Sequence, residues 1–323
     1  MGVGPRFGTG HQIRMLELRE RLERAGIAVA WYEHSDSSNV ADASRSFDLT
    51  RLLEKLNAPD APNTIVIDAR DIDPTLFATA GRRVLALDNR HPVRDAIAMN
   101  SKNARVEFYD TIPHPQAQLA LTLEQALIRA DVLELREKKS QPQPRSIFVY
   151  SGDFFVPALD RILARMAVAG WSVHRCGAQA PEEAITGTLK QSGFRWSPRL
   201  ERDVYCAELS RSEFVGAYFG MTVLEAWYLQ RTPFLFSVTS VIHNELGMYL
   251  NRSAGLPFID AEKMLHDAAG DADRALGAIF ASVGARTTSG GATIAPGGQG
   301  FDRLVARVRG LIYSAGASSA DTV

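Results

Sequence analysis

The sequence predicts an α/β protein of two domains, each a parallel sheet flanked by helices. Short apolar runs at residues 64–68 and 84–88 are hydrophobic on both faces, as strands of a sheet buried between helices must be. Segments with helical periodicity alternate with such runs, which indicates right-handed strand–helix–strand units. The pattern starts again at Ser146, after a polar stretch with two prolines. We therefore expect two sheets, with their ligand edges facing a cleft.

Composition narrows the class of protein. The chain has 323 residues, 46% of them hydrophobic and 23% charged, which is ordinary for a globular protein of about two domains. The net charge of −1 gives no basic surplus for nucleic acid, so we expect none as a partner. No apolar run is long enough to span a membrane and no signal peptide is recognisable, so a cytoplasmic location is expected. The two cysteines, Cys176 and Cys206, fit a reducing compartment and offer no zinc pair, and no metal or cofactor is expected.

The first domain is expected to span residues 1–143. Its predicted elements are a helix behind Gly10 that ends at Gly26, a strand over 27–32, helices over 48–56 and 74–80, the strands 64–68 and 84–88, and a helix over 122–139. The polar segment 137–144 then predicts the linker.

The second domain is expected to span residues 144–323. Its predicted elements are strands over 146–150, 171–175 and 214–218, and helices over 157–169, 203–209 and 301–313. It begins as the first does, with a strand, a turn of small residues at Ser151 and Gly152, and a helix.

The first candidate site is the turn Gly8-Thr9-Gly10 in front of the first helix. Glycines let the backbone approach a ligand, and the free N–H groups and dipole of a helix start favour a phosphate. His11 follows this turn, where an imidazole could take a proton from water or a hydroxyl. Arg14 could stabilise a leaving diphosphate. A plain tight turn and a hydrogen-bonding helix-start histidine are the alternatives.

Polar residues also follow the predicted strands. Asp68 and Asp88 each end an apolar run, at the edge where open α/β sheets bind ligands, although aspartate is also common there in Asx turns. Gly220 and Thr222 lie at a second helix start, and Glu225, one turn on, could accept hydrogen bonds from ribose hydroxyls or simply balance the helix dipole. His243 is expected after a strand at the same edge.

Four motifs together resemble a known family, the UDP-sugar hydrolases of the pseudaminic acid pathway and their spore-coat polysaccharide relatives. The run from Gly8 to Arg14 resembles the family's G-x-G-H-x-x-R opening, and the run from Gly220 to Glu225 is similar to its G-x-T-x-x-E helix. The region from Asp88 through Asp95 to Asn100 and the segment 298–303 look like two further motifs of that family.

The resemblance implies a fold of the glycosyltransferase B type, two Rossmann-like domains with the nucleotide held mainly by the second. It also implies that His11 is the general base for water attacking the anomeric carbon, without a metal. Thr222 and Glu225 would contact the diphosphate and the ribose, and His243 would stand where a glutamine is usual.

The sequence thus predicts an enzyme that hydrolyses a UDP-sugar or a related nucleotide-sugar. A glycosyltransferase with the same donor and a non-catalytic nucleotide-sugar binding protein are the alternatives. The candidate catalytic residues are His11 and Arg14. The candidate substrate-binding residues are Gly8, Thr9, Gly10, Asp68, Asp88, Ser151, Gly152, Gly220, Met221, Thr222, Glu225, His243 and Asn244.

Overall fold

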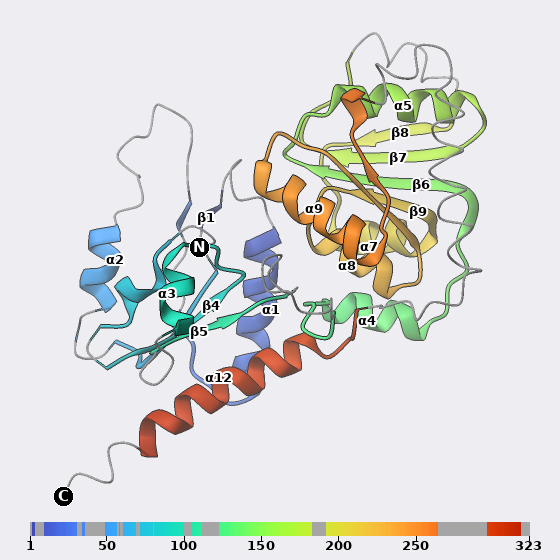
Figure 1. Cartoon of the computed structure of the whole chain (residues 1–323). Helices are drawn as coiled ribbons and strands as arrows, with labels where there is room; N and C mark the ends of the chain where they lie inside the picture. The colour runs from blue at the N-terminus through green and yellow to red at the C-terminus, as the bar shows by residue number, and fades with distance from the viewer. Residues whose placement is uncertain are drawn as a thin grey trace, which may run out of the picture. The chain divides into compact units, whose positions relative to one another are not determined.

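The structure is a computed structural model of the chain, shown in Figure 1. It describes residues 2–3, 10–30, 34–35, 49–56, 58, 61–68, 72–79, 81–99, 105–111, 123–182, 192–263 and 296–317. The chain forms two compact units: unit 1 comprises Met1–His114, Leu123–Leu127 and Gly298–Val323, and unit 2 comprises Pro115–Thr122 and Ile128–Gly297. The last helix therefore groups with unit 1, whereas a linear division near residue 143 assigns it to the second domain.

Unit 1 contains a three-stranded parallel sheet in the order β3-β4-β5 and a separate parallel pair of β1 with β2. Its elements are β1 Gly2–Val3, α1 Gly10–Arg24, β2 His34–Ser35, α2 Leu49–Leu56, β3 Thr64–Ile67, the 3-10 helix η2 Pro74–Phe77, β4 Arg83–Leu87, α3 Val93–Met99, β5 Val106–Tyr109 and α12 Gly300–Ala317.

Both faces of the unit 1 sheet are covered. On one face Leu85 and Leu87 of β4 pack with Leu18 of α1 and with Phe301 and Leu304 of α12. On the other face, apolar residues of β3, β4 and β5 pack with α2, η2 and α3. Burial on both faces explains why β3 and β4 read as uninterrupted apolar runs, and the predicted strands at 64–68 and 84–88 are confirmed.

Unit 2 contains a six-stranded parallel sheet in the order β11-β10-β9-β6-β7-β8. Its elements are α4 Ala130–Glu137, β6 Gln143–Gly152, α5 Pro157–Val168, β7 Ser172–Gly177, β8 Phe194–Ser197, α7 Arg202–Arg211, β9 Ser212–Ala217, α8 Met221–Tyr228, β10 Thr232–Phe236, α9 Val241–Ala254 and β11 Phe258–Ile259.

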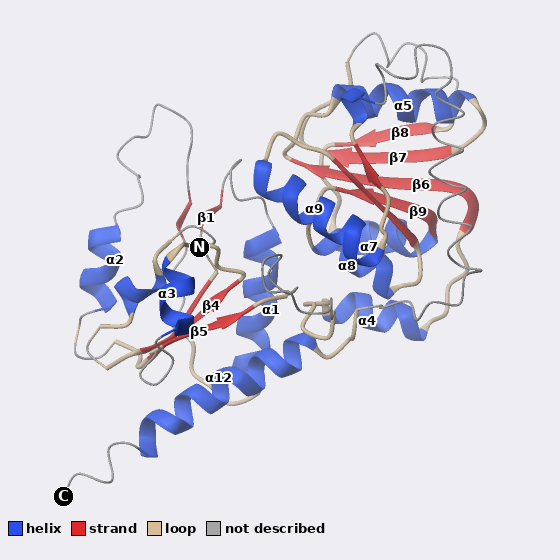
Figure 2. Ribbon diagram, in the orientation of Figure 1, coloured by secondary structure: helices blue, strands red, loops and turns tan. Residues whose placement is uncertain are grey.

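Side chains of the central strands alternate between two helix layers, which Figure 2 shows on either side of the unit 2 sheet. Ile147, Val149 and Val173 pack with Leu159 and Leu163 of α5. The alternate residues of β6 and β7 face α7 instead, as the ring contact of Phe148 with Tyr205 shows. The predicted α/β class with parallel sheets is confirmed.

Three predicted elements differ from the structure. The helix predicted over 74–80 is only the 3-10 helix η2, Pro74–Phe77. Residues 27–30 of the predicted strand 27–32 lie outside any strand, although Ile27 and Val29 still pack against the unit 1 core. The predicted helix 122–139 is formed only from Ala130, because residues 126–129 are buried in irregular backbone instead. No helix in the described part of the chain is both long and apolar enough to cross a membrane.

Packing at the start of α12 generates the first prediction. A Cβ placed on Gly300 would lie 2.0 Å from the carbonyl oxygen of Ala126, whereas one on Gly310 would meet nothing within 4 Å. We expect Gly300→Ala to lower the free energy of unfolding by about 1–3 kcal/mol, because backbone must move. Gly310→Ala, in the same helix, should raise it by about 0.5–1 kcal/mol. Urea unfolding of both variants tests this, and equal effects would contradict the packing.

Candidate functional site

The predicted turn at Gly8 and Thr9 lies outside the described residues. Gly10 is the first residue of α1 and His11 the second. Arg14 follows one turn later on the same helix.

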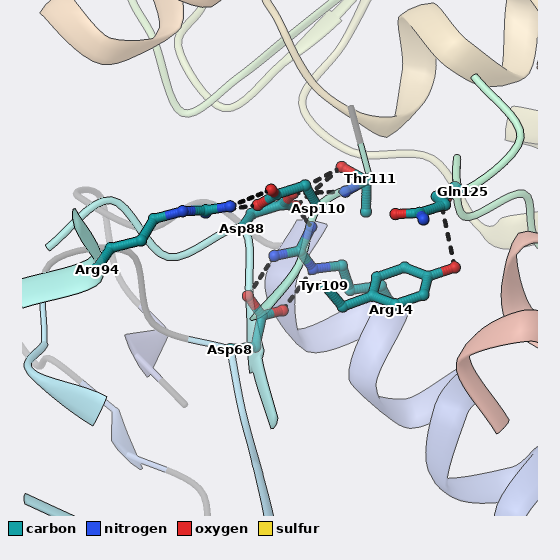
Figure 3. A network of polar contacts seen from close by, with 8 residues as sticks. All are labelled: Arg14, Asp68, Asp88, Arg94, Tyr109, Asp110, Thr111 and Gln125. Carbon is teal, nitrogen blue, oxygen red and sulfur yellow. Dashed lines mark hydrogen bonds and ion pairs between the residues drawn. The ribbon is translucent and has the colours of Figure 1, made fainter. Parts of the chain in front are cut away.

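The Arg14 guanidinium is held between two carboxylates, as Figure 3 shows. Its Nε donates to Asp68 Oδ2 at 2.5 Å, its Nη2 also donates to Asp68, and its Nη1 donates to Asp88 Oδ2 at 2.6 Å. The three side chains are 7%, 0% and 7% exposed. A two-pronged bond from arginine to a carboxylate fixes orientation as well as distance.

The sheet explains why the two aspartates meet. Asp68 and Asp88 directly follow β3 and β4, and these neighbouring strands pair Ile67 with Ala86. Asp88 has a φ of 45°, a left-handed conformation that is unfavourable for a residue with a side chain. It is held there by Thr111, whose N–H donates to Asp88 Oδ1 at 2.8 Å. Strain kept by surrounding bonds is typical of functional or strongly constrained positions.

The charges of Asp68 and Asp88 keep the Arg14 side chain ionised within this cluster. Burial by itself would lower its pKa, but the charges of Asp68 and Asp88 outweigh burial and raise the pKa above the ordinary value. The guanidinium stays charged, and the cluster carries one formal negative charge. Arg14 was predicted to stabilise a leaving diphosphate, and the aspartates to bind substrate. The structure shows all three groups bound to one another, and their contact with a substrate stays a prediction.

The second predicted site lies where the strands of unit 2 end. Ser151 and Gly152 close β6, and a register shift lies between Tyr150 and Gly152. Gly152 has a φ of 56°, and a Cβ there would lie 2.9 Å from the Tyr218 hydroxyl. Glycine is therefore required twice over, by backbone conformation and by space.

The start of α8 is open. Gly220 is the N-cap, no side chain caps the helix, and its first turn holds no acidic residue. A Cβ on Gly220 would find no atom closer than 3.8 Å, in the Tyr218 ring. Because β9 pairs with β6 up to Ala217 and Tyr150, this helix start and the Ser151–Gly152 turn follow adjacent strands. Unbonded N–H groups at a helix start next to a glycine turn can bind an anion.

Glu225 and Thr222 belong to a buried network. Arg129 Nε and Nη2 donate to the Glu225 carboxylate at 2.5 and 2.9 Å, and the Tyr205 hydroxyl donates to it at 3.0 Å. That hydroxyl also lies 2.9 Å from the Thr222 hydroxyl. The Glu225 side chain is 1% exposed. Its oxygens accept from Arg129 and Tyr205, and a contact of Glu225 with ribose hydroxyls stays a prediction.

The pKa values agree with this internal role. Burial raises the pKa of Tyr205 well above its ordinary value, and the Glu225 charge raises it further, so the phenol remains a donor. Burial opposes the charge of Arg129, but the Glu225 charge outweighs burial and raises the Arg129 pKa. Glu225 is a candidate site residue in the sequence, whereas no sequence pattern predicts its partner Arg129, which is 96 residues away.

His243 and Asn244 lie in the first turn of α9, not at a strand end. His243 Nδ1 lies 2.7 Å from Ser240 Oγ, and its ring is 5.6 Å from Phe154 and 5.2 Å from Tyr218. The three partly exposed rings come from three segments that follow strands of one sheet. Asn244 instead stabilises the loop between β10 and α9, because its side chain accepts from the Val238 N–H at 2.9 Å and donates to the Val238 carbonyl at 2.7 Å.

A buried ion pair that the sequence did not reveal lies beside the Ser151–Gly152 turn. Arg175 Nε donates to Asp160 Oδ1 at 2.9 Å, and both side chains are fully buried. A Cβ on Gly177 would lie 2.1 Å from Ser151 Oγ and 2.8 Å from Arg175 Nη1, which puts this guanidinium next to the turn. Burial raises the pKa of Asp160 to about 6, although Arg175 acts to lower it.

In the portion of the chain with described coordinates, no group of three or more His, Cys, Asp and Glu side chains is placed to hold a metal ion.

Comparisons with known proteins define the fold. No family model matches the chain, and no curated protein matches it. Solved structures do match, and they show a fold of the glycosyltransferase B type, as predicted. One is Acinetobacter baumannii MurG, with 13% sequence identity, a TM-score of 0.60 and coverage of 94% of this chain and 97% of that chain. Another is a Listeria monocytogenes protein assigned as a UDP-N-acetylglucosamine 2-epimerase, with 11% identity, a TM-score of 0.50 and coverage of 97% and 95%.

Loss of the Arg14 charge should destabilise the folded chain. In Arg14→Met two buried carboxylates would face each other without a cation, so we expect the free energy of unfolding at neutral pH to fall by about 3–5 kcal/mol. The loss should shrink as the pH is lowered, because protonation then relieves the repulsion. Arg19→Met, which breaks an exposed pair with Glu23, should cost about 0–1 kcal/mol. A small, pH-independent loss in Arg14→Met would contradict the assigned role.

Asp160 should titrate near neutrality. Carboxyl 13C NMR should give it a midpoint of about 6, while Asp131, whose burial is outweighed by a hydrogen bond from Arg202, titrates below its ordinary value. Because the pKa of Asp160 is raised on folding, its protonated form contributes stability at low pH that is lost as the pH rises to about 6. A midpoint for Asp160 below 4 would contradict the effect of burial.

Proposed function

We propose that this chain is an enzyme that binds a nucleotide-diphospho-sugar and cleaves it at the anomeric carbon with water. The observation that carries the proposal is the pair of glycine turns on adjacent strands of unit 2, Ser151–Gly152 and Gly220–Met221, the second opening a helix without a side-chain cap. Such a pair offers backbone N–H groups to both phosphates of a diphosphate. The fold, and the UDP-sugar in the name of one structural relative, support this substrate class.

The leaving group is proposed to be stabilised by backbone dipoles. Arg14, Arg129 and Arg175 are buried arginines near the strand ends, and each is bound to a carboxylate. The negative charge that develops on the diphosphate is therefore assigned to the first turn of α8, whose N–H groups need no reorganisation to receive it. Thr222 and Glu225 hold that turn through Tyr205 and Arg129, and they serve as positioning residues.

His11 is proposed as the general base. It would take a proton from water as the water oxygen attacks the anomeric carbon, and the bond to the diphosphate oxygen would break. The second residue of α1 stays fixed as long as Arg14, three residues further on, is bound to Asp68 and Asp88. In a glycosyltransferase the same base would act on a hydroxyl of the acceptor, and a protein without the base function would only bind the nucleotide.

A cytoplasmic location is part of the proposal. Both cysteines, Cys176 and Cys206, are buried and form no disulfide, as expected in a reducing compartment.

The base is tested by turnover. With UDP-N-acetylglucosamine and related donors, released UDP is measured with and without added acceptors. His11→Ala should lower turnover by about two to four orders of magnitude and leave the dissociation constant of UDP within about threefold. Release that needs an acceptor would establish transfer, and UDP binding without release from any donor would establish the binding protein.

The anion site is tested by two variants that match in size and differ in charge. Gly220→Asp and Gly220→Asn should both cap α8 and preserve or slightly raise stability. Only Gly220→Asp places a carboxylate beside the phosphates, so it should weaken UDP binding by at least about tenfold, or 1.4 kcal/mol. Calorimetry in which both variants bind UDP as the unmodified chain does would refute this site.

A further inference from the structure

A serine, a histidine and a glutamate lie in line on the α7 side of the unit 2 sheet, and none of them is a residue of the proposed nucleotide site. Ser197 Oγ lies 3.0 Å from His174 Nε2, and His174 Nδ1 lies 3.0 Å from Glu208 Oε1. Nucleophile, base and orienting carboxylate within hydrogen-bond reach form the arrangement by which enzymes activate serine. It is recognised by geometry rather than by order in the chain.

The sheet register brings these side chains together. β7 and β8 are parallel, with His174 opposite Arg195 and Cys176 opposite Ser197. Residues two apart on a strand share a face, so His174 and Ser197 point to the same side. That side faces α7, which supplies Glu208.

The neighbours select the tautomer in which His174 can act as a base. Nδ1 lies 3.0 Å from the Glu208 carboxylate and 3.4 Å from Arg195 Nη2. The shorter contact is with the acceptor, so the proton belongs on Nδ1 and the lone pair on Nε2 faces the serine hydroxyl. Burial raises the pKa of Glu208, but the hydrogen bond from His174 and the charges of Arg211 and Arg195 outweigh it and lower the pKa. The carboxylate therefore stays ionised.

Of the three residues, Ser197 is the most exposed, as a nucleophile should be. Glu208 and His174 have side chains that are 5% and 6% exposed, whereas Ser197 is partly exposed at the end of β8, the edge strand. Beside it lie the side chains of Arg195 and Arg199, 53% and 74% exposed. Ser197 is thus the residue of the three that an electrophile from solvent would meet first, and the cations favour an electrophile with an anionic leaving group.

We propose that Ser197, His174 and Glu208 form a second, nucleophilic site that takes acyl groups from activated esters. The Ser197 proton passes to His174 Nε2 as the bond from Oγ to the acyl carbon forms. The bond from that carbon to the leaving oxygen then breaks, and the leaving group either takes the proton from His174 or departs as an anion while His174 releases its proton to solvent. Water, deprotonated by His174, hydrolyses the acyl-serine to the carboxylate and restores the hydroxyl. Glu208 acts through His174 as a positioning residue.

Activity should be modest. The residue after Ser197 is Pro198, which has no N–H to donate to an oxyanion. A missing oxyanion donor costs about 10²–10³ in rate, so activated esters such as p-nitrophenyl acetate are the expected substrates rather than amides.

The test uses the full chain and a fluorophosphonate probe, with the labelled residue located by mass spectrometry. One adduct per chain is expected on Ser197, and none in Ser197→Ala. His174→Gln should slow labelling by at least about a hundredfold, while Ser192→Ala, on the turn before β8, should label normally. The same pattern is expected for the release of p-nitrophenolate.

Two outcomes would overturn the proposal: no adduct on Ser197 in the unmodified chain, or labelling of Ser197 at an unchanged rate in His174→Gln. Glu208→Gln guards against misfolding of the histidine variant. It should keep a labelled Ser197 but slow the reaction, and a labelling rate equal to that of the unmodified chain would remove Glu208 from the site. Because the UDP-release assay does not involve these residues, its result stands or fails separately.

Discussion

In each unit a buried arginine paired with carboxylate fixes the position of a helix at the strand ends. Arg14 joins the first turns of α1 to the ends of β3 and β4, and Arg129 joins the start of α4 to α8 through Glu225. Burying such pairs costs desolvation that the attraction only partly returns, so their main effect is to specify geometry. The helices α1 and α8 are thereby held in one orientation, each relative to the strand ends of its own unit.

This constraint explains the chemistry proposed for the site. Because Arg14 and Arg129 are neutralised internally, we assign binding of the anionic ligand to backbone N–H groups. The uncapped start of α8 and the turn at Gly152 are the proposed source of these groups. Rigid placement of dipoles suits a reaction in which charge moves to a leaving diphosphate.

Much of the fold could be predicted from the sequence because its strands and helices produce recognisable local patterns of apolar residues. Parallel strands buried on both faces appear as apolar runs, so β3, β4, β6 and β7 were found, and Asp68 and Asp88 were placed at strand ends. Partners of buried charges could not be found in this way: Arg14 meets Asp88 across 74 residues, and Arg129 meets Glu225 across 96. The helical pattern at 122–129 was overridden by tertiary packing, which buries Leu127 with α12. Ser197, His174 and Glu208 carried no motif at all, since only the register of β7 and β8 aligns them.

The central claim is that backbone amides at two adjacent strand ends of unit 2 bind the diphosphate, while the buried arginines keep their carboxylate partners. An amide NMR titration of the full chain with UDP tests this most directly. The account predicts the largest shift changes at Gly152, Gly220 and Met221, with the Nε–H signals of Arg14 and Arg129 unchanged. Large changes in either arginine signal, or saturation by UDP without any change at Gly220, would contradict it.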